Sequence, residues 1–208
     1  MADLTDEIAA SAAQCVVEEG LEYGPAKRRA LKLLGLPPRT ALPNNDQLEA
    51  QVREYIELFC ADTQPGELLA LRRHALMWMQ RLTAFRPYLG GAVWHGTATR
   101  LSDIYLQLFC DDVKSCEIEL INKGVNYEAT SVKGLHGDPV DALSIHSYCE
   151  DLGEEVGVHL LVNDFDDVRG ALKLDAQGRS PRGDTAAVQR LIEASTTCLL
   201  YTSPSPRD

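Results

Sequence analysis

The sequence contains no long apolar run, although it is 208 residues long. A helix that crosses a bilayer needs about 20 consecutive apolar residues, and no stretch approaches that length. The N-terminal "MADLTDEIAAS" is acidic and lacks the basic and then apolar order of a signal peptide. We therefore expect a cytoplasmic protein without a membrane partner.

Positive charge is also scarce, with 20 Lys and Arg against 31 Asp and Glu and a net charge of -11. Extended nucleic-acid binding depends on clustered basic residues that displace counterions from phosphates. The basic stretch "AKRRALK" (residues 26–32) is better explained as a solvated helix face. The composition disfavours a long nucleic-acid footprint and favours a small-molecule or protein partner.

The six cysteines include no C-x-x-C pair and have no regular spacing, which disfavours a disulfide framework and a zinc knuckle. Reduced and mostly buried thiols are favoured. His136, His146, His159 and Cys149 also lack spacings typical of zinc, so structural histidines are favoured. The lysine motif G-x-x-x-x-G-K-[ST] is missing too, which excludes a P-loop nucleotide site.

Residues 1–88 read as a helical lobe. Apolar residues recur at helical spacing in four segments, for example the single stripe Leu48, Val52, Tyr55, Ile56 and Phe59, with Asn45 or Asp46 as the expected cap. From Gly90 onward the period changes from 3.6 to 2. Residues 92–95 ("AVWH") read as a short strand, and 103–109, 124–132, 141–148 and 156–165 read as further strands.

Helices are expected at 113–124, 166–173 and 184–195, capped by Asp111 or Asp112, by Asp166 or Asp167, and by Asp184. Helices followed by mixed strands and helices indicate an α+β fold with one mixed sheet at 89–197.

The loop between residues 96 and 103 has the residue types of a phosphate and metal site. Glycine at position 96 lets the backbone approach a phosphate, the hydroxyls of Thr97 and Thr99 can donate to its oxygens, and Arg100 adds positive charge. Asp103, which opens the next strand, can hold Mg²⁺ that bridges those phosphates. A plain turn at Gly96 and a plain strand-entry role for Asp103 remain about equally favoured.

The order helix, strand, "HGT", loop, "SDI", strand resembles the nucleotidyltransferase superfamily, which includes DNA polymerase β and the minimal nucleotidyltransferases, over about residues 70–132. Gly96 and Thr97 match the glycine and its hydroxyl neighbour, and Asp103 matches the first acid of the returning strand. The resemblance implies a mixed-sheet domain, NTP as ligand, and Mg²⁺ held by Asp103 as the catalytic acid.

Two residues bear on whether catalysis survives. Tyr105 stands where the superfamily has a second acid, and two-metal transfer depends on paired carboxylates. Glu128 stands where the superfamily has its third carboxylate, and it can share a metal with Asp103 if their strands are neighbours. A solvated role for Glu128 is otherwise favoured.

Two further resemblances concern the whole chain and its end. "EYGPAKRRALKLLG" and "GGAVWHGTATRLSDIYLQLF" resemble uncharacterised proteobacterial proteins sometimes labelled UDP-N-acetylmuramate-alanine ligases. The missing P-loop disfavours that activity. Residues 198–208 ("CLLYTSPSPRD") resemble a translated sequencing adaptor, and we expect a non-native tail there.

Two functions remain open. One is Mg²⁺-dependent transfer of a nucleotidyl group from an NTP. The other is a nucleotide-binding or protein-interaction module on the same fold whose catalysis lapsed when the second acid became Tyr105.

Overall fold

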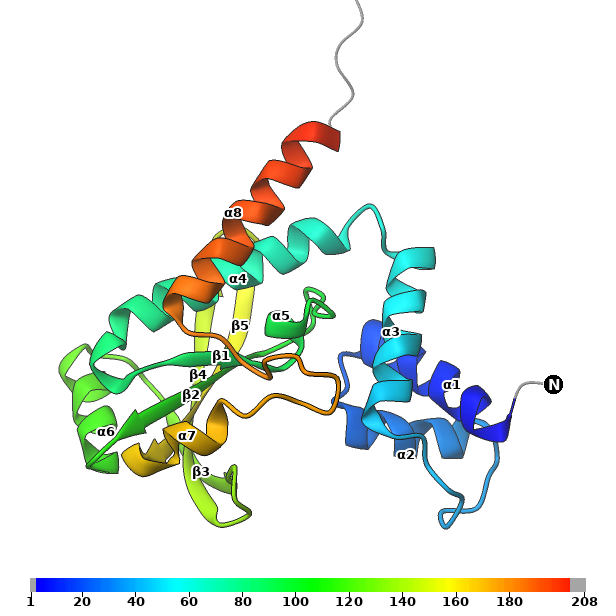
Figure 1. Cartoon of the computed structure of the whole chain (residues 1–208), viewed down its shortest axis with the longest axis horizontal. Helices are drawn as coiled ribbons and strands as arrows, with labels where there is room; N and C mark the ends of the chain where they lie inside the picture. Colours follow the sequence, from blue (N-terminus) through cyan, green and yellow to red (C-terminus); the bar gives the residue numbers. More distant parts are fainter. Residues whose placement is uncertain (1–2, 203–208) are drawn as a thin grey trace, which may run out of the picture. The chain divides into compact units, whose positions relative to one another are not determined.

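The computed structural model describes residues 3–202, with side chains described for residues 3–197. The chain forms two compact units. The first contains the residues up to Glu67 together with Thr97–Ser102, and the second contains Leu68–Gly96 and the chain from Asp103 onward. Figure 1 shows the elements along the chain.

The first unit is built from helices α1 (Leu4–Glu19), α2 (Tyr23–Leu33) and α3 (Asn45–Phe59), and α4 (Gln64–Arg81) begins in it. Its core is a cluster of small and aliphatic side chains from the first three helices, including the stripe Leu48, Val52 and Ile56. The cap of α3 is Asn44, which forms a reciprocal capping box with Gln47. The predicted cap was one or two residues too late.

The second unit contains a five-stranded sheet in the order β1-β2-β5-β4-β3. Its strands are β1 (Tyr88–Gly90), β2 (Ile104–Cys110), β3 (Glu128–Lys133), β4 (Pro139–Cys149) and β5 (Glu154–Asp164). β2 and β5 run parallel, while the other neighbouring pairs are antiparallel. The mixed sheet and the helices confirm the predicted α+β class.

The two faces of this sheet differ in chemistry. Ile104, Leu106 and Leu108 of β2 are fully buried on one face, beside Val158 and Leu160 of β5. The intervening residues of β2 and their partners lie on the opposite face, because successive side chains of a strand alternate. That second face, called the polar face below, carries Asp103, Tyr105, Ser144, His159 and Glu128.

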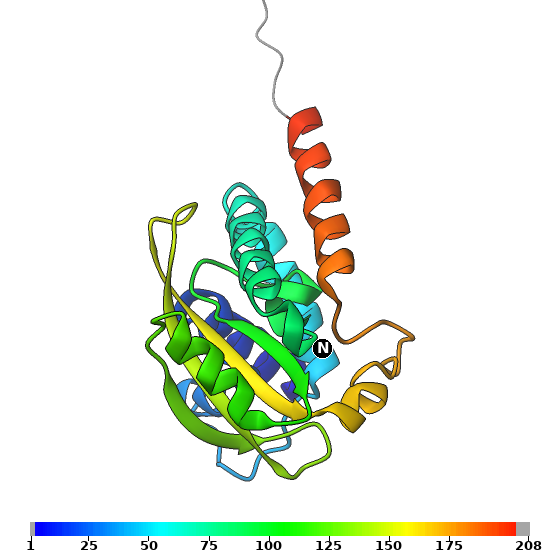
Figure 2. The same ribbon diagram turned by 90° about the vertical axis from the view of Figure 1, so that its left-hand side faces the viewer.

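Helices and short turns complete the second unit: η1 (Thr83–Phe85), α5 (Gly91–His95), α6 (Val113–Asn122), η2 (Phe165–Asp167), α7 (Val168–Ala171) and α8 (Thr185–Thr202). α6 runs alongside β5 (Figure 2). The Asp112 carboxylate caps α6 and the Asp184 carboxylate caps α8, as predicted. Asp167 precedes α7, but its side chain makes no cap hydrogen bond.

The segment "AVWH" is helical and not a strand, so that prediction was wrong. It belongs to α5, which ends at Gly96 with φ 88°, in the left-handed region that glycine tolerates. The buried Arg72 guanidinium donates to the carbonyl oxygens of Val93 and Trp94, at 3.0 and 3.2 Å. A cation on the last carbonyls favours a helix end, and four residues are too few to distinguish a strand from a helix by period.

Within the described part of the chain, none of the helices combines the length and apolarity needed to cross a membrane. The five cysteines whose side chains are described are free, and Cys15, Cys116 and Cys149 are buried. The sixth, Cys198, lies where side chains are not described, and residues 203–208 of the predicted tail lie outside the described residues.

Candidate functional site

Asp103 lies at the entry to β2, and its carboxylate is engaged by a histidine. Its Oδ2 is 2.9 Å from Nε2 of His159 on the neighbouring strand β5. This hydrogen bond holds the pKa of Asp103 below its usual value, against the opposing effect of partial burial. A hydrogen bond from the Gly157 backbone also lowers the pKa of Asp103. A Cβ atom at Gly157 would lie only 2.6 Å from the Asp103 Oδ1. Asp103 therefore sits in a close-fitting niche beside β5.

Glu128 does not share this niche. Glu128 on β3 is paired with Ser144 on β4, and Ser144 is paired with His159 on β5. His159 is in turn paired with Tyr105 on β2. Three strand spacings of about 4.8 Å separate the strands of Glu128 and Asp103, which amounts to about 14 Å. The strands are not neighbours, so the condition for a shared metal is not met. Among the described residues, no group of three or more His, Cys, Asp or Glu side chains could hold a metal ion.

The predicted phosphate loop is divided between the units. Gly96 ends α5 in the second unit, whereas Thr97, Thr99 and Arg100 belong to the first. There the backbone N–H of Arg100 donates to the Glu67 carboxylate at 3.0 Å. The predicted site residues therefore do not form one group within either unit.

Within the first unit, both threonines of the loop are buried. The Thr97 hydroxyl is hydrogen-bonded to Tyr23, and the Thr99 N–H donates to the Ser102 hydroxyl at 3.0 Å. The backbone N–H groups of Thr99 and Arg100 thus already donate to oxygens of the chain.

A hydrogen-bonded chain of three side chains crosses the polar face from β2 to β4. Beyond Asp103, the other ring nitrogen of His159, Nδ1, is 2.8 Å from the Ser144 hydroxyl oxygen. An ionised carboxylate only accepts hydrogen bonds, so Nε2 carries the ring proton that is donated to Asp103. In the neutral ring Nδ1 then accepts from the Ser144 hydroxyl. Asp103 thereby selects the tautomer of His159.

Sequence patterns favoured a structural role for His159 and gave no reason to expect a role for Ser144. The parity of β5 offered one signal, because His159 alternates with the apolar Val158 and Leu160 and so faces away from the core. The pairing of β5 with β2 offered no signal in the sequence. Sequence periodicity gives the face of a residue but not the neighbouring strand.

Tyr105 lies on the opposite side of His159 from Ser144. The two rings stack with centroids 4.9 Å apart and an interplanar angle of 26°. The next register partner of Tyr105 is Gly90 on β1, which has no side chain. A Cβ at Gly90 would lie 3.9 Å from Cβ of Arg182. An arginine and two stacked rings therefore lie in one row on the polar face near the β1 edge of the sheet. In order from that edge, the row is Arg182, Gly90, Tyr105 and His159.

Arg182 comes from a loop that follows α7 and joins the edge of β1. The backbone N–H groups of Leu89 and Gly183 each donate to the other residue's carbonyl, at 2.8 and 2.9 Å. The Arg182 side chain donates to the Ala171 carbonyl, yet its buried Nε has no hydrogen-bond partner within the described structure. Desolvation lowers the pKa of Arg182. This guanidinium therefore retains donor capacity in a partly desolvated position.

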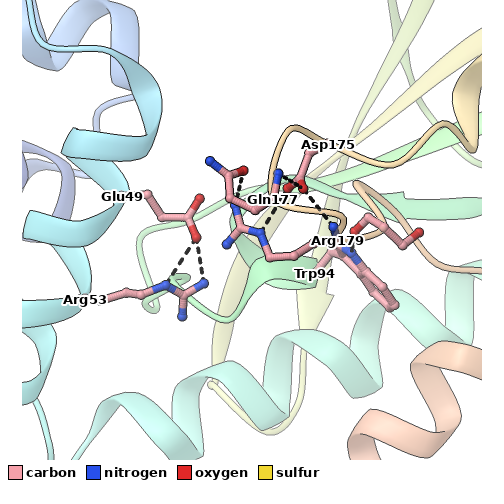
Figure 3. Close-up of polar contacts among 7 residues, drawn as sticks. Glu49, Arg53, Trp94, Asp175, Gln177 and Arg179 are labelled. Carbon is pink, nitrogen blue, oxygen red and sulfur yellow. Dashed lines mark hydrogen bonds and ion pairs between the residues drawn. The ribbon is translucent and has the colours of Figure 1, made fainter.

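The same loop is braced by a turn, drawn in Figure 3. Asp175 accepts from the backbone N–H and the side chain of Arg179, at 2.8 and 2.9 Å. The Trp94 indole N–H donates to the Ser180 carbonyl at 2.8 Å, and a Cβ at Gly183 would collide with the Trp94 ring. The loop that carries Arg182 is thus fixed at both ends.

No protein-family model matches the chain, and no curated protein matches its sequence. Solved structures that resemble it include Cid1 in complex with the UTP analogue UMPNPP, with 15% identity and a TM-score of 0.34 over 55% of this chain and 36% of that one. The Cid1 poly(U) polymerase with MgGTP bound gives 13% identity and a TM-score of 0.35 over 53% and 37%. This chain spans about a third of the length of those structures.

Proposed function

We propose that the second unit is a nucleotide-binding module on a nucleotidyltransferase-like sheet, in which metal-dependent nucleotidyl transfer has lapsed. The observation that carries the proposal is the row Arg182, Gly90, Tyr105 and His159 on the polar face, where the superfamily pattern would have a second acid at Tyr105. The resemblance of Gly96, Thr97 and Asp103 to the superfamily motif supports the ligand class.

The acids of this unit do not fit the Mg²⁺ that the resemblance implies. Two-metal transfer depends on carboxylates that hold two cations about 4 Å apart. Asp103 instead accepts from His159, Tyr105 replaces the second acid, and Glu128 lies three strands away. The acids of this unit therefore do not support metal-dependent transfer.

The stacked rings and Arg182 match different parts of a nucleotide. An aromatic ring binds any base through its face, and such stacking contributes about 1–3 kcal/mol per base. Gly90, the β1 residue paired with Tyr105, has no side chain, so the Tyr105 ring has no side-chain neighbour at that position. A guanidinium pairs with phosphate oxygens through a planar set of donors. The base would stack at Tyr105, and the phosphate would pair with Arg182.

Thermal shift with UTP, ATP and the corresponding nucleosides, each with Mg²⁺ and with EDTA, tests the proposal. A ligand that binds only the native state stabilises it by about 2.7 kcal/mol at 100 times its Kd. We expect a rise in melting temperature for nucleotides in both conditions. Tyr105→Ala is expected to abolish the rise, while the matched control Tyr105→Phe, which keeps the ring, retains it.

Arg182→Lys separates the charge from the guanidinium geometry, and we expect it to weaken the response to UTP more than the response to uridine. Pyrophosphate release that requires Mg²⁺ and disappears in Asp103→Ala would restore the transferase hypothesis and contradict the lapse. If nucleotides raise the melting temperature of Tyr105→Ala as much as that of the unaltered protein, the base does not bind at Tyr105 on the polar face.

A further inference from the structure

The chain Asp103, His159 and Ser144 has the connectivity of a carboxylate–histidine–hydroxyl nucleophile system. The carboxylate is 2.9 Å from one ring nitrogen and the hydroxyl is 2.8 Å from the other. Ser144 and His159 are register partners on β4 and β5, and Asp103 immediately precedes β2, the other neighbour of β5. Backbone pairing therefore fixes the spacing of Ser144 and His159 and places Asp103 beside β5. A rigid arrangement of this kind favours proton transfer, because no side chain must move to reach its partner.

We propose that Ser144 is a nucleophile that His159 activates as general base and Asp103 positions. Asp103 accepts the Nε2 proton and so leaves the Nδ1 lone pair directed at the Ser144 hydroxyl. The ring nitrogens have exchanged roles relative to the usual hydrolase triad, but the logic of base and orienting acid is the same. The proposal does not depend on nucleotide binding at Tyr105.

The side chains of Asp103, His159 and Ser144 are accessible enough for a small reagent to reach them. The side chain of His159 is 25% exposed and that of Asp103 is 45% exposed. Ser144 is partly buried. A hydroxyl that served only to fill the core would be expected on the opposite face of β4, where Leu143 and Ile145 are buried.

The charge next to Ser144 selects the class of substrate. Its register partner on β3 is the exposed Glu128, so a carboxylate lies on the strand beside the nucleophile. Directly opposed residues on neighbouring strands have Cβ atoms about 4.5–5.5 Å apart, close enough for a like charge to be repelled. An anionic ester is therefore disfavoured, and a neutral carboxylic ester is the class that this position fits.

The step balances with water as the only co-reactant. The Ser144 oxygen bonds to the ester carbonyl carbon while its proton passes to Nδ1 of His159. The bond from that carbon to the leaving alkoxide then breaks, and the alkoxide takes the proton from Nδ1 as it departs. Water hydrolyses the resulting acyl-serine by the same route, giving the carboxylic acid and free Ser144.

A neutral dialkyl fluorophosphonate tests nucleophilicity directly. The serine oxygen bonds to phosphorus, the phosphorus–fluorine bond breaks, and fluoride leaves as the hydroxyl proton passes to His159. We expect covalent labelling at Ser144, located by peptide mass spectrometry, and none at that peptide in Ser144→Ala. General-base catalysis contributes about 10²–10⁴-fold, so His159→Ala is expected to slow labelling by about 10²-fold or more.

Ser147 supplies a matched control on the same strand. It contacts His74 at 2.8 Å, but within the described part of the chain that histidine makes no hydrogen bond to an acid. Ser147→Ala is expected to leave labelling of Ser144 unchanged. Asp103→Asn keeps the size of the side chain and is expected to slow labelling by about tenfold or more through loss of the tautomer preference. If His159→Ala does not fold, Asp103→Asn carries the comparison.

Two results would overturn the proposal. One is no labelling of Ser144 in the folded, unaltered chain under conditions that label a serine hydrolase completely. The other is a labelling rate in folded Asp103→Asn equal to that of the unaltered protein. Neither result depends on a nucleotide, so failure here is distinguishable from failure of the nucleotide-binding proposal.

Discussion

The two faces of β4 present the same pair of residue types in opposite surroundings. On the polar face the Ser144 hydroxyl contacts His159, which is hydrogen-bonded to Asp103. On the buried face the Ser147 hydroxyl contacts His74 and accepts from the Trp78 indole N–H at 2.9 Å. A carboxylate orients the first histidine, whereas the second is buried and contacts a serine.

The difference shows what each pair can do. Because the indole N–H only donates, it fixes Ser147 as its acceptor and leaves the serine proton for His74 Nε2. Desolvation, with a smaller contribution from Arg81, lowers the pKa of His74 and favours its neutral form. The buried pair therefore anchors α4 to the sheet, while the exposed pair has an acid and access to reagents. The same two residue types serve packing on one face and chemistry on the other.

The largest expected effect comes from breaking the buried side. Trp78 is 3% exposed, so Trp78→Ala removes a large side chain and leaves Ser147 without its donor. Truncation of a buried Trp costs about 3–5 kcal/mol, and we expect a loss of that size in the free energy of unfolding. Urea titration followed by circular dichroism measures it. A loss below about 1 kcal/mol would show that α4 is not anchored by this residue.

Comparison of the two serine deletions sharpens the contrast. Ser147→Ala leaves a buried donor unsatisfied at Trp78, which costs about 1–3 kcal/mol. Ser144→Ala removes a partner from a partly exposed histidine that water can reach, and we expect about 0.5–1 kcal/mol. Both values follow from urea titrations of the single variants. Equal costs would contradict the assignment of one serine to packing and the other to chemistry.

The smallest expected effect is a pair of pH dependences. The folded-state pKa values of His74 and Asp103 both lie below their ordinary values of 6.5 and 3.8. For a lowered pKa the unfolded state binds more protons, so each stabilising contribution is present at high pH and is lost as pH falls. The His74 contribution should decline below about pH 6.5 and the Asp103 contribution only below about pH 3.8.

Melting temperatures measured from pH 3 to pH 8, roughly the range that spans both ordinary values, check this order. His74→Gln should flatten the upper part of the profile by about 1–2 °C. Asp103→Asn should flatten only the most acidic part. An acidic limb in Asp103→Asn equal to that of the unaltered protein would show that this carboxylate makes no such contribution.

Much of the fold follows from periodicity. The alternation of Ile104, Leu106 and Leu108 with their neighbours predicted which face of β2 is buried. The helical stripe of α3 predicted three buried core residues, but its last member, Phe59, is 70% exposed. Phe109 departs from the alternation, since it is buried on the polar parity and packs edge-to-face on Tyr88. Local patterns therefore predicted the elements and most of their orientations.

The neighbours of Asp103 lay beyond such patterns. A strand's period does not reveal that β5, the last strand in the sequence, is inserted between β2 and β4. That insertion brings His159 to Asp103 and leaves Glu128 at the far edge of the sheet. The short motif around Gly96 also could not reveal that the Glu67 carboxylate accepts a hydrogen bond from the Arg100 backbone N–H. That contact joins residues 33 positions apart in the sequence.

The inserted segment Thr97–Ser102 has a consequence for how this chain can be divided. It is bonded to the helical unit by Gln64, which donates to the Ala98 carbonyl at 2.8 Å, and by Glu67. Any single cut in the gene leaves one product without a stretch that its own unit requires. A cut after Glu67 leaves the second unit complete but removes Thr97–Ser102 from the helical unit, so recombination that preserves both units must carry the two together.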